Sequence, residues 1–216
     1  MCMATWSKTC SPDMCNVYRL KEKKVVADIE DAVNESIRQL ASKLIRRSGR
    51  GPVMRQQGSE VVVEEMRWGF ERGFSDSINN ARTDNLKSKV WEEAYEKRRC
   101  LVPITEFYEW QPLPFDKKQP HAFRHPDEDE WLWVAGLWEH SERHGACYAT
   151  LTTEPSAAME PIHDRMLAIV GLKRGLEFLA GSQLKSTPYN GPLTITPCES
   201  PLKQKGLLDQ AQGELF

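Results

Sequence analysis

Cys15 is the residue of this sequence whose position suggests the most specific chemistry. It follows Met14 and precedes a short strand-like run, Asn16–Leu20. If translation begins at Met14, removal of the initiator methionine leaves Cys15 as the first residue, with an amine and a thiol on neighbouring carbons. Such a pair reacts with an aldehyde, because the amine forms an imine and the thiolate then closes a five-membered thiazolidine. The second step is intramolecular and gains from proximity.

Three polar residues further along the chain, each in an otherwise apolar setting, could assist that reaction. Glu109 is flanked by aromatic residues, which raise a carboxyl pKa and suit it to shuttle protons during amine attack and loss of water. His163 can donate a proton to a departing oxygen, and Asn80 can orient the amine or the thiol. Taken alone, each also has a structural explanation: a loop cap for Asn80, a solvent-facing strand position for Glu109 and a structural histidine for His163.

The ordered set of motifs around these residues resembles the SRAP family, the SOS-response-associated peptidases or abasic-site processing proteins. Each motif is weak alone, and their order along residues 14 to about 200 makes the resemblance specific. The matching pieces are Met14–Tyr18, Met66–Phe70, Asn80–Arg82, Arg99–Pro103, Phe107–Trp110, Ala135–Glu139, Thr152–Thr153 and Ile162–Met166.

The resemblance implies a protein that binds single-stranded DNA and crosslinks to abasic sites through an N-terminal cysteine. Carried over by motif, Cys15 is the nucleophile, Glu109 is the acid and base, and Asn80 and His163 complete the catalytic site. We expect neither a metal nor a cofactor. The positions that fall where the family contacts DNA are Trp68, Arg82, Thr152 and Arg165, with Arg67 as a further phosphate contact.

Two other functions remain open at this stage. A cysteine peptidase acting on proteins would use the Cys15 thiol as nucleophile and His163 as base. A non-catalytic single-strand binding module would show salt-sensitive binding and no covalent product on denaturing gels.

The start of the chain departs from the family pattern, because Met-Cys occurs both at residues 1–2 and at residues 14–15. The residues after Cys15 fit the family motif better than those after Cys2. We therefore expect residues 1–13 to be a leader that reflects a misassigned start or is removed by autoproteolysis. While the leader is attached, Cys15 has no free amine. Smaller departures from the family pattern occur at Asp84, Glu106 and Leu167.

The other end of the chain suggests a second partner. Gln212, Leu215 and Phe216 are spaced like the short peptides that dock on the bacterial sliding clamp, where the apolar pair fills a pocket. A frayed terminus with chance apolar residues is the alternative. We expect residues 14–198 to form one SRAP-like domain, residues 199–216 to form a tail, and the protein to be a monomer.

Composition limits the remaining classes. The 216 residues carry a formal net charge of −2, so any DNA-binding surface must be local. The six cysteines form no CxxC pair, which argues against a zinc ribbon or finger, and Cys100 and Cys147 lie in apolar runs as expected of buried free thiols. Neither a signal peptide nor a membrane span is evident, so we expect a cytoplasmic, nucleoid-associated protein.

The elements that must position these groups are mainly short strands. Apolar residues at spacings of three and four predict a helix over 26–46, and shorter helices are predicted over 87–98 and 173–181. Strands and helices do not alternate regularly, so we predict an α+β fold with a mainly antiparallel, barrel-like sheet. The predicted strands are Val53–Gln56, Glu60–Met66, Cys100–Ile104, Phe107–Gln111, Trp131–Trp138, Ala146–Thr152, Met166–Val170 and Leu193–Thr196.

Overall fold

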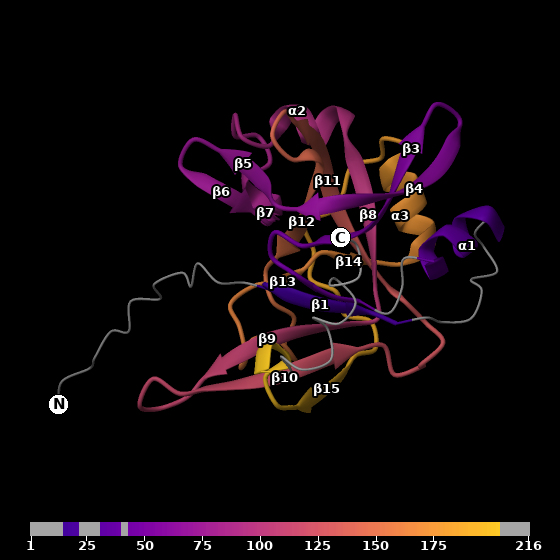
Figure 1. Cartoon of the computed structure of the whole chain (residues 1–216). Coiled ribbons are helices and arrows are strands. Elements are labelled where there is room, and N and C mark those ends of the chain that lie inside the picture. Colours follow the sequence, from indigo (N-terminus) through magenta and orange to yellow (C-terminus); the bar gives the residue numbers. More distant parts are fainter. Residues whose placement is uncertain (1–14, 22–30, 40–42, 204–216) are drawn as a thin grey trace, which may run out of the picture.

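A closed ring of five strands forms the centre of the molecule (Figure 1). The structure is a computed structural model of the chain, and it describes residues 15–21, 31–39 and 43–203. The ring runs β12–β4–β3–β8–β11 and returns to β12, and every pairing except β12–β4 is antiparallel. Closure leaves no free edge in the ring. Its strands are β3 (Arg50–Gln57), β4 (Glu60–Trp68), β8 (Arg99–Ile104), β11 (Leu132–Ser141) and β12 (Gly145–Thr153).

A second, antiparallel sheet lies below this ring in Figure 1 and carries the start of the described chain. Its order is β15–β10–β9–β1–β2, and β1 and β9 pair with Tyr18 opposite Phe107. This pairing brings the chain just before β1 next to the middle of β9. The strands are β1 (Val17–Leu20), β2 (Lys43–Arg46), β9 (Glu106–Pro112), β10 (Lys118–Arg124) and β15 (Thr194–Pro197).

Short elements complete the fold. β7 pairs in parallel with β12, β13 and β14 extend the ring, and β5 and β6 form a separate hairpin. Helix α3 packs against β8 and β11. No helix in the described ranges is long and apolar enough to cross a membrane. These elements are β5 (Phe70–Arg72), β6 (Ser75–Ile78), β7 (Asn80–Arg82), β13 (Met166–Leu167), β14 (Ile169–Val170), α1 (Asp31–Gln39), α2 (Glu92–Lys97), α3 (Leu172–Leu179) and the 3₁₀ turns η1 (Thr83–Asn85) and η2 (Pro201–Lys203).

The predicted α+β, mainly antiparallel and barrel-like fold is confirmed, and one predicted helix is wrong in its second half. The chain is helical over α1, but Lys43–Arg46 is strand β2, and residues 26–30 and 40–42 lie outside the described residues. Leu44 and Ile45 explain the difference. Ile45 is buried in the main core and Leu44 packs on a second apolar cluster, so adjacent residues face opposite sides, as only a strand allows.

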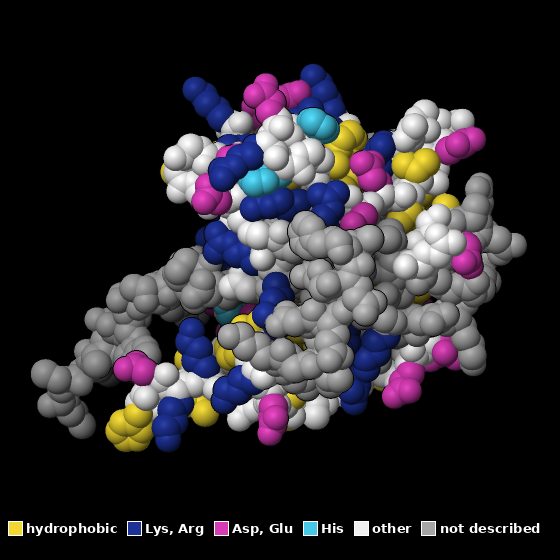
Figure 2. Space-filling view, in the orientation of Figure 1, with side chains coloured by type: hydrophobic (Ala, Val, Ile, Leu, Met, Phe, Trp, Pro, Cys, Tyr) yellow, Lys and Arg dark blue, Asp and Glu magenta, His cyan; other side chains and the backbone are white. Residues whose placement is uncertain are grey.

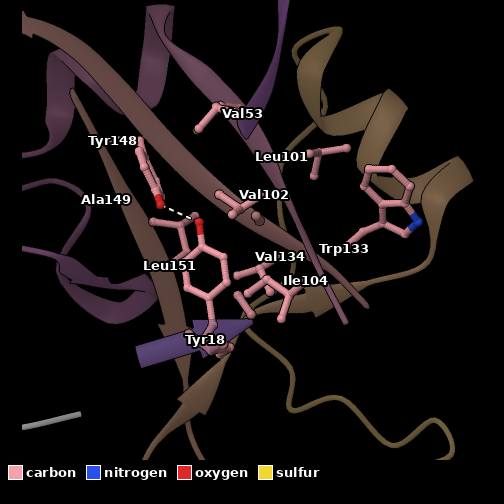
Figure 3. Close-up of a cluster of buried hydrophobic side chains, with 14 of the residues drawn as sticks. Tyr18, Val53, Leu101, Val102, Ile104, Trp133, Val134, Tyr148, Ala149 and Leu151 are labelled. Atoms are coloured by element: carbon pink, nitrogen blue, oxygen red, sulfur yellow. Dashed lines mark hydrogen bonds between the residues drawn. The ribbon is translucent and has the colours of Figure 1, made fainter. Parts of the chain in front are cut away.

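Two tyrosines from different sheets share a hydrogen bond inside the core (Figure 3). The hydroxyls of Tyr18 and Tyr148 are 2.5 Å apart, and both side chains are completely buried. Gly51 makes room for the pair, since a Cβ at this position would collide with the Tyr18 hydroxyl. Each hydroxyl is therefore the partner that the other needs in an interior without water.

We expect Tyr18→Phe to lower the free energy of unfolding by about 1–3 kcal/mol, because it leaves the Tyr148 hydroxyl buried without its partner. The double variant Tyr18→Phe/Tyr148→Phe removes both polar groups and should recover part of that loss. Urea denaturation of the three proteins measures both effects. A single variant as stable as the parent would contradict the prediction.

Candidate functional site

Cys15 and Glu109 meet at the junction of β1 and β9. The backbone nitrogen of Cys15 donates a hydrogen bond to Oε1 of Glu109 at 2.9 Å, and both residues are 0% exposed. In the full chain, this nitrogen is the amide of the Met14–Cys15 peptide bond. In a chain that begins at Cys15, the same atom is the α-amine. The site therefore places a carboxyl group against the one nitrogen that processing would convert into a nucleophile.

Burial controls the protonation of this pair. Loss of hydration raises the pKa of Glu109 well above its usual value; the hydrogen bond from Cys15 opposes the rise, and the charge of Asp164 adds to it. Burial also raises the pKa of the Cys15 thiol, and the neighbouring carboxylate raises it further. Oε2 of Glu109 has no hydrogen-bond partner among the described residues. A carboxyl group with a raised pKa and one oxygen that lacks a described partner is suited to exchange protons with a reacting group.

Two consecutive asparagines hold the other end of Cys15. Nδ2 of Asn79 donates to the Cys15 carbonyl oxygen at 3.2 Å, and Nδ2 of Asn80 approaches the same oxygen at 3.5 Å. Asn80 also accepts a hydrogen bond from the Thr150 hydroxyl through Oδ1. We expected Asn80 to orient the amine or the thiol, whereas the bond seen here reaches the carbonyl. Asn79 is a site residue that sequence reasoning missed.

His163 lies on a loop that is tied to β9. Gln111, two residues after Glu109, donates through Nε2 to the carbonyl oxygen of Pro161 at 3.2 Å. Nδ1 of His163 accepts the Arg165 amide and also lies 3.1 Å from Oδ1 of Asp164, while Nε2 is a buried atom without a partner in the described part of the chain. Burial lowers the pKa of this histidine, although the nearby Asp164 opposes the effect.

The hydrogen bonds found for His163 within the described ranges do not reach Cys15. Among the described residues, the bond from Sγ of Cys15 goes to the Val17 carbonyl oxygen at 3.8 Å. None of those found joins His163 to Cys15 or to Glu109. The loop is thus brought beside the strand of Glu109, while no hydrogen bond between the imidazole and the thiol is found in the described part of the chain.

The expectation that Trp68 contacts DNA does not agree with the burial of its side chain in this structure. Its ring is 0% exposed, lies edge-on to Tyr18 and is stacked on Tyr148 at 6.2 Å between ring centroids. The indole Nε1 donates to the Asn79 carbonyl oxygen at 2.9 Å. Trp68 therefore supports the asparagine that holds Cys15, and it presents no face to solvent.

Three of the other predicted DNA contacts lie together beside β7. Nη2 of Arg165 donates to the Thr152 carbonyl oxygen at 2.7 Å, and Nη1 lies 3.8 Å from Asp84. Arg82 pairs with the same Asp84 at 2.7 Å and is exposed. Both Thr152 and Arg165 are largely buried, and Nε of Arg165 is buried with no partner among the described residues.

Arg67 lies apart from that group. It donates to the carbonyl oxygens of Gly69 and Asp76 and so ties β4 to the β5–β6 hairpin. Arg67 pairs with β12 at Cys147, whereas Arg82 pairs with it at Thr152, five residues or about 16 Å further along the strand. Arg67 and Arg82 are therefore not parts of one compact phosphate site.

The remaining expectations concern cysteines, metals and the termini. Cys100 and Cys147 are buried free thiols, as predicted, and Cys15 and Cys198 are also free. Within the described ranges no three His, Cys, Asp or Glu side chains gather in a way that could hold a metal ion. The leader 1–13 and the clamp-like residues Gln212, Leu215 and Phe216 lie outside the described residues.

Comparison with known proteins gives a consistent set of relatives. A family model described as SOS response associated peptidase (SRAP) matches residues 14–202. The abasic site processing protein YoaM of Bacillus subtilis is 28% identical over 133 residues, which cover 56% of this chain and 58% of that protein. The abasic site processing protein HMCES of Xenopus tropicalis is 30% identical over 144 residues, which cover 52% of this chain and 43% of that protein. The chain spans about half the length of the curated relatives it matches.

Solved structures support the fold. A protein from Bacteroides thetaiotaomicron superimposes with a TM-score of 0.68 at 19% identity, over 85% of this chain and 91% of that one. A phage-related protein from Bordetella bronchiseptica gives a TM-score of 0.57 at 22% identity, over 86% and 95%. At these identities the likeness shows a shared fold.

Proposed function

This chain belongs to the SOS response associated peptidase (SRAP) family, and from that premise we propose that it processes abasic sites in single-stranded DNA by forming a covalent thiazolidine through Cys15. Relatives such as YoaM and HMCES carry the name abasic site processing protein. The observation that carries the proposal is the 2.9 Å hydrogen bond between the Cys15 nitrogen and Glu109. In the proposed reaction this nitrogen attacks the aldehyde and the buried carboxyl carries the proton, and the hydrogen bond supports both roles.

The reaction needs an amine, a thiol and one group that moves protons. The neutral amine of Cys15, with an ordinary pKa of about 7.7–8.0, adds to the aldehyde carbon of the ring-opened sugar. The Glu109 carboxyl then protonates the carbinolamine hydroxyl, which leaves as water and gives an imine. Sγ of Cys15 adds to the imine carbon while the thiol proton passes to the nitrogen. One water is released and the ring is closed.

The other residues of the site fit positioning roles. Asn79 and Asn80 hold the Cys15 carbonyl, so the amine and the thiol keep one orientation toward an incoming aldehyde. Nε2 of His163 is buried without a partner among the described residues, and it can hydrogen-bond the sugar oxygen as the ring opens. Arg82 and Arg165 supply positive charge for the phosphates next to the lesion, once a phosphate displaces Asp84.

Incubation with abasic single-stranded DNA followed by a denaturing gel tests the proposal. A protein that starts at Met14 and loses that residue should give a slow-migrating, denaturation-resistant product. The full chain should give none for as long as residues 1–14 remain attached, because its Cys15 nitrogen is then an amide. A processed protein that binds the DNA without a covalent product would support a binding module in place of the crosslinking function.

A second candidate function is self-cleavage at the Met14–Cys15 bond. Cys15 has φ +26°, a conformation that is strained for a residue with a side chain, and its amide nitrogen contacts Glu109. Attack of Sγ on the preceding carbonyl carbon would break the C–N bond and form a thioester, with Glu109 relaying the thiol proton to the nitrogen. Water would then hydrolyse the thioester, free the leader as an acid and restore the thiol. A peptidase acting in trans is less well supported, since no described hydrogen bond links the Cys15 thiol to His163.

Mass spectrometry of the purified full chain tests self-cleavage. We expect loss of residues 1–14 from the parent and an intact leader in Cys15→Ala and in Glu109→Gln. An intact parent after prolonged incubation would rule self-cleavage out and leave the crosslinking proposal standing.

A further inference from the structure

The β9–β10 hairpin ends in an unusually exposed aromatic side chain. Phe115 is 92% exposed and Leu113, two residues before it, is 40% exposed. The Leu113 amide donates to the Lys117 carbonyl oxygen at 2.8 Å and closes the tip. Within it, Phe115 and Asp116 both adopt left-handed backbone conformations, with φ of +62° and +56°. Two adjacent residues other than glycine rarely do so, and no burial of Phe115 offsets the strain.

This tip is the outer end of the strand that carries Glu109. Alternation along β9 places Glu109 and Gln111 on one face, the register puts His121 and Gln119 opposite them, and Leu113 follows directly after the strand. The face thus leads from the buried carboxyl to the exposed tip. Phe115 follows Glu109 by six positions along the chain, so the Cα atoms of the two residues lie at most about 20 Å apart. A strand of DNA held at Cys15 can reach it only through bases that flank the lesion.

The charges at the tip favour nucleic acid over an apolar partner. Lys117 and Lys118 are both exposed beside Phe115, against the single carboxylate of Asp116. The charge of Lys118 also contributes to the lowered pKa of His163, which links the tip electrostatically to the site loop. In Figure 2 a hydrophobic side chain stands at the end of this projecting hairpin with Lys or Arg side chains next to it. Proteins that bind single-stranded nucleic acid use exposed aromatic rings to stack on unpaired bases and basic side chains to neutralise the phosphates.

We propose that the hairpin tip, residues 113–118, is a second DNA contact, in which Phe115 stacks on a base flanking the abasic site and Lys117 and Lys118 bind the adjoining phosphates. The inference rests on the proposed function and adds a specific contact to it. It predicts that the protein binds the DNA on one side of the lesion, at nucleotides beyond the reacting sugar.

Oligonucleotide length separates this contact from the reaction itself. We expect Phe115→Ala to raise the half-saturating concentration of an abasic oligonucleotide of about 30 nucleotides by about 5- to 100-fold, the worth of one stacked base. We expect an oligonucleotide of about 5 nucleotides centred on the lesion to end short of the tip, so parent and variant should bind it equally. The matched control Phe115→Tyr keeps the ring and should behave as the parent on both. The pair Lys117→Gln/Lys118→Gln should reduce the slope of log affinity against log salt by about 1.4 on the long strand only.

The outcomes are distinguishable. Equal binding of the long strand by the parent and Phe115→Ala, with normal crosslinking by both, overturns the hairpin contact alone. An equal loss at both lengths also overturns it, because a remote contact cannot affect the short strand. A parent that crosslinks neither oligonucleotide defeats the proposed function instead.

Discussion

Replacing Cys15 with serine, in a chain that begins at residue 15, should abolish the denaturation-resistant crosslink to abasic DNA. Serine retains the amine, so the imine still forms, but its hydroxyl is a far weaker nucleophile than a thiolate and the imine hydrolyses when the protein unfolds. Because the ring-closing step loses a thiol held on the adjacent carbon, we expect the yield of stable product to fall by at least about 100-fold. Band intensities on a denaturing gel after equal incubation measure the change.

Borohydride reduction supplies the control for that experiment. It converts an imine to a stable amine, so Cys15→Ser with reductant should recover a crosslink and show that DNA binding and amine attack persist. Cys198→Ser changes another free thiol, on the residue that follows β15, and should match the parent without reductant. Full crosslinking by Cys15→Ser in the absence of reductant would exclude the thiazolidine.

The sequence predicts best those strands in which the run of apolar residues matches the run of residues buried in the fold. The strands β8, β11 and β12 are nearly continuous apolar runs, because both faces of a closed barrel strand are covered, and they were predicted close to their observed ends. β10 was missed because Pro120 and polar neighbours interrupt its pattern; in the fold Pro120 is buried opposite Trp110. The apolar residues at spacings of three and four predict a helix where β2 lies, because their spacing does not reveal that β2 pairs with β1.

For the candidate site too, the sequence indicates some residues and leaves out those whose role depends on tertiary contacts. Motif order singled out Cys15, Asn80 and Glu109, and the β1–β9 pairing and β7 bring these residues together. The burial of Trp68 depends on alternation along β4, in which Met66 and Trp68 both face the core, and this signal was present in the sequence. Nothing local distinguishes Asn79 from Asn80, because only the tertiary structure shows that both amides reach one carbonyl. The catalytic and DNA-binding roles stay predictions.

Glu109→Gln is the second change for which we expect a large effect. The amide oxygen can still accept the hydrogen bond from the Cys15 nitrogen, so the geometry is preserved, but glutamine cannot donate and retrieve a proton. Crosslinking by a chain that begins at Cys15 should slow by about 10²- to 10⁴-fold, the usual contribution of a positioned acid or base. Single-turnover time courses on denaturing gels give the rate. DNA affinity should be unchanged, and an unchanged rate would exclude Glu109 as the proton carrier.

Glu109→Gln should also stabilise the protein that still carries residues 1–14. Crosslinking requires a carboxyl group that gives up a proton, whereas stability favours a buried group that does not ionise. With residues 1–14 attached, the Cys15 nitrogen is an uncharged amide, and burial raises the folded-state pKa of Glu109 above its unfolded value. A raised pKa means that the carboxyl's contribution to stability is fully present below about pH 4.3 and is lost as the pH rises through the folded value. Glutamine does not ionise and avoids that loss.

Thermal unfolding of Cys15→Ala, which keeps the leader attached, with and without Glu109→Gln therefore tests why the carboxyl is buried. At about pH 4 the two proteins should melt together, whereas at about pH 8 the glutamine variant should melt higher, by about 2–4 °C for each kcal/mol that ionisation costs. A glutamine variant that melts lower at pH 8 would mean that Glu109 is a satisfied structural anion. A higher melting point together with slower crosslinking means that the fold retains a destabilising group because the reaction requires it.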